Sequence, residues 1–124
     1  YEDSLLLFQH GRHSNAYYLA GYSVELGLKA ALSIQFARDT LPDKKFVADA
    51  YTHKLSELVK LAGLQATLRT ALDADAAVAA NWGIVAAWDE SSRYESTDPF
   101  KVTQLLSALS DVDTGVFPWV KLHW

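Results

Sequence analysis

The chain has no cysteine and no methionine among its 124 residues, and it has only three prolines. Without cysteine there is no disulfide, no thiolate zinc site and no cysteine nucleophile. Glu25 and Lys29 interrupt the longest apolar stretch, so no run reaches the roughly 18 apolar residues that a membrane-spanning helix needs. The acidic N-terminal segment does not have the pattern of a secretory signal peptide. We therefore expect a cytoplasmic domain without membrane contact.

Positive charge is scarce as well, because 11 Lys and Arg residues stand against 15 Asp and Glu residues, which gives a net charge of −4. Proteins that bind nucleic acid over a general surface usually carry a basic excess, since neutralised phosphates supply most of the non-specific affinity. This composition argues against general DNA binding and leaves a local nucleotide pocket open. Because the chain has no methionine and begins within a helical pattern, we expect one domain over residues 1–124 with a further segment before it.

Apolar residues recur at intervals of three and four in four blocks, which is the spacing of amphipathic helices. No convincing alternation of apolar and polar residues predicts a strand. Four helices with short connections predict an all-α fold, an antiparallel up-and-down bundle of four to five helices. The expected blocks cover residues 2–37, 52–64, 65–88 and 98–114, with a turn at 39–45 and an aromatic tail after Gly115 and Pro118.

Several residues mark the expected ends of these helices. Thr52 and Asp98 are good N-caps, and Pro99 stands at the first helical position, where proline is favoured. Gly63 stands where a C-terminal left-handed residue belongs. Breaks within blocks are expected near Gly11 and at the segment 73–76, whose sequence is DADA.

The segment 16–32, AYYLAGYSVELGLKAAL, carries two distinct faces when it is drawn as a helix. One is a polar stripe of Tyr18, Tyr22, Glu25 and Lys29. This stripe is either an ion pair at the rim of the fold, of the i,i+4 kind, or a partly buried polar site that reaches other helices. The opposite face has only small residues and predicts a close helix contact, inside the bundle or across a dimer: Ala16, Ala20, Ser23, Gly27 and Ala31.

A second group of candidate residues, Trp88, Arg93 and Tyr94, precedes the last long helix. Two interpretations are open. Arg93 either pairs with Glu25 and ties the loop to the core, or presents its guanidinium group beside an aromatic ring to a phosphate or base. Trp88 and Tyr94 correspondingly either pack in the core or form part of a binding surface.

The four histidines do not have the spacing of a metal site, and no glycine-rich phosphate loop or nucleophile elbow is present. His53, which follows Thr52, is expected in the first turn of its helix. The residues themselves therefore predict no metal, no cofactor and no catalytic group.

The stretch AYYLAGYSVELGLKAAL resembles the signature helix of HEPN-domain proteins (higher eukaryotes and prokaryotes nucleotide-binding). The segments THKLSELVKLAGL, SSRYES after the two spaced tryptophans, and VFPWVKLHW agree with it in order and spacing. The resemblance implies an all-α bundle that forms a homodimer. It also implies that the domain binds a nucleotide or RNA, or pairs with a minimal nucleotidyltransferase in a prokaryotic toxin–antitoxin system.

Many HEPN proteins are metal-independent ribonucleases that use an arginine followed four to six residues later by a histidine. Arg93 is the matching arginine here, but no histidine follows it at that distance. Cleavage needs an acid–base group as well as a group that stabilises the phosphate, so we expect a non-catalytic module. Its polar groove would be lined by residues of both candidate groups: Glu25, Lys29, Arg93, Tyr94 and Tyr22, with Trp88 as the apolar wall.

Two alternatives to this non-catalytic binding module stay open. In the first, the domain is a divergent ribonuclease in which His53 or His13 replaces the missing histidine. In the second, the polar stripe is an internal salt-bridged network and the domain serves only in assembly.

Overall fold

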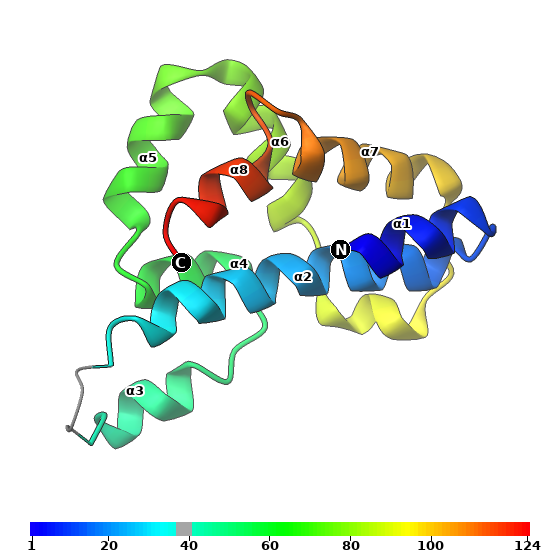
Figure 1. Ribbon diagram of the computed structural model, residues 1–124. Coiled ribbons are helices and arrows are strands. Elements are labelled where there is room, and N and C mark those ends of the chain that lie inside the picture. Colours follow the sequence, from blue (N-terminus) through cyan, green and yellow to red (C-terminus); the bar gives the residue numbers. More distant parts are fainter. Residues whose placement is uncertain (37–40) are drawn as a thin grey trace.

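A computed structural model describes residues 1–36 and 41–124, which form α-helices, one short 3-10 helix and no strand (Figure 1). The expected all-α class is confirmed. The described residues contain eight α-helices, more than the four or five expected. In chain order the elements are α1 (Glu2–Gln9), α2 (His13–Ser33), α3 (Lys44–Asp49), α4 (Leu55–Leu61), α5 (Gln65–Ala74), α6 (Ala76–Ala86), η1 (Glu90–Tyr94), α7 (Pro99–Ser110) and α8 (Val116–Lys121).

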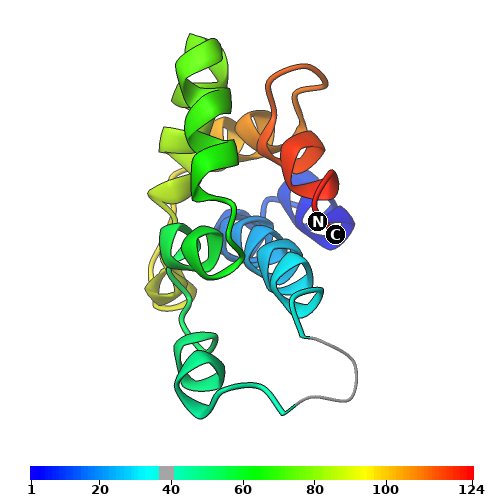
Figure 2. The same ribbon diagram turned by 90° about the vertical axis from the view of Figure 1, so that its left-hand side faces the viewer.

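Helix α2 is the centre of the fold, because α1, α4, η1, α7 and α8 all pack against it (Figure 1). Figure 2 shows α1 and α4 on opposite sides of α2, while α3 lies at one end of the molecule, where Phe46 packs against a small cluster at the end of α2. Ten of the 21 residues of α2 are buried, which is why an almost wholly apolar helix is stable here. None of the described helices is both long and apolar enough to cross a bilayer.

The expected break near Gly11 is confirmed, because this residue has a φ of +71° between α1 and α2. The first block is shorter than expected, because α2 ends at Ser33 and residues 34–36 form a turn and a bend. The expected end at Ala37 lies outside the described residues, as do the first two residues of the expected turn at 39–45. The prediction of a turn is wrong for its last two residues, because Lys44 and Lys45 begin α3. The reason is that the Asp43 carboxylate accepts a hydrogen bond from the Phe46 backbone N–H (3.0 Å) and so caps a helix.

The N-cap expected at Thr52 is also wrong. Lys54 precedes the first residue of α4, and the Thr52 hydroxyl instead accepts a bond from the Lys54 backbone N–H (3.2 Å), which closes a local turn. Gly63 has the expected left-handed conformation, with a φ of +70°. The expected break in the third block is confirmed as well, because Asp75 separates α5 from α6 and caps α6 through the Ala77 backbone N–H (2.7 Å).

The start of α7 is confirmed, with Asp98 as N-cap and Pro99 as the first helical residue. The helix ends at Ser110 instead of at 114, because the Asp111 carboxylate binds the Thr114 backbone N–H (2.7 Å) and folds the chain into a turn. The expected aromatic tail is largely helical, since residues 116–121 form α8. Pro118 lies in the first turn of α8, where a missing backbone N–H breaks no helical bond.

The small face of α2 is covered by the chain itself. Ala16 and Ala20 are fully buried, and Gly27 lies so close to α8 and the C-terminal residue that an added Cβ would stand 3.0 Å from Val120 and 2.6 Å from Trp124. The close contact expected for this face is thus an intramolecular one. Gly21 has a comparable role next to this face, because the indole ring of the buried Trp88 occupies the space of its missing side chain.

We expect Gly21→Ala to destabilise the fold by about 1–3 kcal/mol, the usual range for overpacking a core. Gly83→Ala is the matched control, because Gly83 lies inside helix α6 with no atom near its added Cβ. That change should instead stabilise the protein, by up to about 1 kcal/mol. Urea unfolding of the three proteins measures both effects, and equal shifts in the same direction would contradict the close approach of Trp88 to Gly21.

Candidate polar binding site

The site is built around Glu25, whose side chain is 1% exposed in the middle of α2. One turn further along, Lys29 donates a hydrogen bond to Oε1 of Glu25 over 2.8 Å. The Lys29 side chain is 28% exposed, so its ammonium group lies at the boundary between core and solvent. The i,i+4 ion pair is therefore present, and its carboxylate is buried while its ammonium group lies at the rim, so the polar stripe is partly buried.

His53 supplies the second partner of Glu25, from the loop that precedes α4. Its Nδ1 lies 3.0 Å from both carboxylate oxygens of Glu25. The expectation of a first-turn helical residue is wrong for His53, because α4 begins two residues later. Nothing in the spacing of His53 indicated Glu25, which is 28 residues earlier in the chain.

The network continues onto η1 through Glu90, a residue to which the sequence patterns gave no role. Nε2 of His53 lies 2.9 Å from Oε2 of Glu90, and a guanidinium nitrogen of Arg93 lies 2.8 Å from the same oxygen. Arg93 Nε also donates to the backbone carbonyl of Glu90 over 3.2 Å. Arg93 therefore does not pair with Glu25 directly, and the two are linked through His53 and Glu90.

The network runs from Lys29 through Glu25, His53 and Glu90 to Arg93. Both ring nitrogens of His53 face carboxylate oxygens, Nδ1 as a hydrogen-bond partner of Glu25 and Nε2 in close contact with Glu90. The side chains of Lys29 and Arg93 supply positive charge at the two ends of the network, and one of its two carboxylates, that of Glu25, is buried.

The conformation of η1 is set locally by its N-cap, Asp89. The Asp89 carboxylate accepts a hydrogen bond from the Ser91 backbone N–H over 2.8 Å. This bond, with smaller contributions from the positive charges of Lys54 and His53, lowers the pKa of Asp89. The short helix is therefore anchored at its start, which places Glu90 and Arg93 beside the loop that carries His53.

Aromatic rings cover one side of the network. Tyr18 and Tyr22 stack with their centroids 5.8 Å apart, and Trp88 lies against Tyr18 at 6.2 Å. The Arg93 guanidinium carbon is 5.7 Å from the centroid of Tyr18 and 5.4 Å from that of Tyr94. Tyr94 is 83% exposed, whereas Trp88 is buried. All six residues expected to line a groove thus lie in this network or against it, with Trp88 in the core and Tyr94 at the surface.

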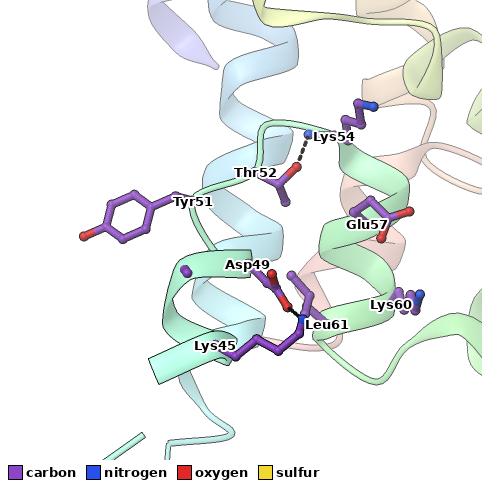
Figure 3. Close-up of a pocket in the computed structure, with 9 residues that line it drawn as sticks. Lys45, Asp49, Tyr51, Thr52, Lys54, Glu57, Lys60 and Leu61 are labelled. Atoms are coloured by element: carbon purple, nitrogen blue, oxygen red, sulfur yellow. Dashed lines mark hydrogen bonds and ion pairs between the residues drawn. The ribbon is translucent and has the colours of Figure 1, made fainter. Parts of the chain in front are cut away.

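A neighbouring groove of about 800 Å³ opens between α3 and α4 (Figure 3). Lys45 and Asp49 on its α3 side form an ion pair of 2.6 Å, and this hydrogen bond raises the pKa of Lys45. Thr52 and Lys54, the neighbours of His53, line the α4 side. The loop 52–54 therefore joins this groove to the Glu25 network.

The other histidines lie apart from this network. His13, the second histidine considered for catalysis, packs edge-on against Phe8 at 5.4 Å, and His123 packs against Trp119 at 4.9 Å. Within residues 1–36 and 41–124, no three His, Asp or Glu side chains are arranged to hold a metal ion.

Comparisons with known proteins add no relative, since no family model, no curated protein and no solved structure matches the chain. The account of the site therefore depends on its geometry alone.

We expect Lys29→Met to destabilise the protein by about 2–4 kcal/mol, because the buried carboxylate of Glu25 would lose its ammonium partner and keep only the His53 ring. In the double variant Glu25→Gln, Lys29→Met the buried charge is gone as well, so its loss of stability should be smaller than that of Lys29→Met alone. Urea unfolding of the two variants tests this order. If the double variant were less stable than Lys29→Met, the result would contradict the statement that Lys29 stabilises the fold by compensating the buried charge of Glu25.

Proposed function

We propose that this chain is a non-catalytic, HEPN-type helical module that binds a nucleotide or RNA at the polar surface formed by Lys29, Arg93 and Tyr94. The observation that supports it is the position of Arg93, whose guanidinium carbon lies 5.7 Å from the centroid of the Tyr18 ring and 5.4 Å from that of the Tyr94 ring. An exposed aromatic ring beside a guanidinium group is a common arrangement for stacking a base and contacting its phosphate. The net negative charge of the chain is compatible with such a local site.

Binding is favoured over catalysis because of the state of His53. Its Nδ1 is held by the buried Glu25 carboxylate, and its Nε2 faces the Glu90 carboxylate at 2.9 Å, so neither nitrogen is open to a ribose hydroxyl as long as Glu90, or a phosphate in its place, occupies that position. A general acid or base must reach the proton that it transfers, within about 2.6–3.2 Å. No other histidine lies in the network.

The proposal also includes a HEPN-type arrangement of the helices and two kinds of protein partner. A long central helix that carries a buried glutamate and a lysine one turn later agrees with the signature segment on which the HEPN resemblance is based. We propose on the same grounds that the domain forms a homodimer and pairs with a minimal nucleotidyltransferase in a prokaryotic toxin–antitoxin system. Such a partner would compete with nucleotide or RNA if it docked on the Arg93 surface.

Replacing Arg93 or Tyr94 by alanine should weaken binding of a nucleoside monophosphate and of a short single-stranded RNA by about 10-fold or more. The reason is that a charge-assisted hydrogen bond and one base-stacking ring each contribute about 1–3 kcal/mol. Arg69→Ala is the matched control, because Arg69 is 80% exposed on the remote helix α5. Fluorescence titration measures the affinities. Folded Arg93→Ala and Tyr94→Ala proteins that bind as tightly as Arg69→Ala would contradict the proposal.

A divergent ribonuclease is the second candidate, and it is favoured by one observation. His53 and Arg93 contact the same oxygen of Glu90, so a histidine and an arginine lie near each other without the expected sequence spacing. This candidate predicts that the purified chain cleaves RNA without metal and that His53→Ala abolishes cleavage, whereas His13→Ala does not. Under our proposal none of the three proteins cleaves a panel of single-stranded RNAs, as gel analysis of the products would show.

A further inference from the structure

The side chains of His53 and Arg93 converge on a single oxygen at the surface of the site. His53 Nε2 lies 2.9 Å and an Arg93 terminal nitrogen 2.8 Å from Oε2 of Glu90. An arginine that converges with a second nitrogen-bearing side chain is typical of sites that bind the oxygens of phosphate groups. In this structure the oxygen comes from the protein's own glutamate.

Both donors are held in place from behind, independently of the Glu90 side chain. The buried carboxylate of Glu25 fixes the His53 ring through Nδ1. Arg93 is held by the Tyr18 and Tyr94 rings and by the bond from its Nε to the Glu90 backbone carbonyl. Removal of the Glu90 carboxylate would therefore leave the two donors oriented toward the same point.

The Glu90 side chain is held less firmly than its partners. It is 36% exposed and belongs to a 3-10 helix of five residues. Exposed ion pairs contribute little net stability, so exchange of this carboxylate for another anion is energetically easy. Displacement of Glu90 would remove one of the two carboxylates of the network and leave Lys29 and Arg93 in place, so the site would become more positive and would suit a phosphate group.

We propose that His53 and Arg93 form a subsite for the phosphate group of a nucleotide or of an RNA strand, and that Glu90 is its internal occupant, which the ligand displaces. This inference rests on the proposed function, because it names the group of the ligand that this surface receives. Glu90 then sets the affinity of the site by competing with phosphate, and Tyr94 receives the adjacent base.

The test compares Glu90→Ala and Glu90→Gln with the control Glu95→Gln, which removes an exposed carboxylate just beyond the same short helix. Inorganic phosphate and adenosine monophosphate are titrated into each protein by calorimetry, with the His53 ring nitrogens followed by NMR. Glu90→Ala should bind both probes about 10-fold more tightly than Glu95→Gln, a difference of about 1.4 kcal/mol in binding free energy. The double variant Glu90→Ala, Arg93→Ala should lose that gain, because it lacks one of the two groups of the subsite.

Folded Glu90→Ala and Glu90→Gln proteins that bind phosphate no more tightly than Glu95→Gln would overturn the subsite. If the wild-type protein still bound nucleotide in a manner that depends on Arg93, the proposed function would survive that result. Tight phosphate binding by Glu90→Ala without nucleotide or RNA binding by any of the proteins would support the subsite and refute the proposed function. If both Glu90 variants unfold, the test is made by NMR on the wild-type protein. The His53 Nε2 signal should then shift at millimolar phosphate, and an unchanged signal would overturn the subsite.

Discussion

The carboxylate of Glu25 is buried in the middle of the central helix, and a carboxylate without water needs hydrogen bonds and positive charge around it. The effective penalty for burying one ion is several kcal/mol. Lys29 reduces it from within α2, and His53 reduces it from the loop before α4. The position of that loop is therefore tied to α2 by an electrostatic requirement as well as by apolar packing.

Apolar packing places the other half of the site. The Trp88 ring fills the space beside Gly21, and this contact brings the end of the third helical block onto α2. The next residues form η1, which brings Glu90 to His53 and Arg93 to Tyr18. A glycine in the core helix thus has a functional consequence, because it permits the close approach that sets the position of the surface arginine.

Local signals predicted several of the helix ends. Asp75 and Asp98 cap their helices through their own side chains, and Gly63 ends one with a positive φ, so each boundary depends on interactions within a few residues. The predictions at Thr52 and Pro118 also rested on local signals, but each signal fits two structures. A threonine hydroxyl can close a turn as well as cap a helix, and proline is compatible with a first helical turn.

The sequence by itself determined the all-α class and the alignment of Tyr18, Tyr22, Glu25 and Lys29 along one side of a helix, because helical periodicity is a local property. Only the tertiary structure decided that His53 meets Glu25 and that Glu90 stands between His53 and Arg93. Those contacts join side chains far apart in sequence, and they depend on how loops and packed faces bring separate helices together. Helical periodicity carries no information about that arrangement, so the contact of Glu25 with His53 could not be predicted from it.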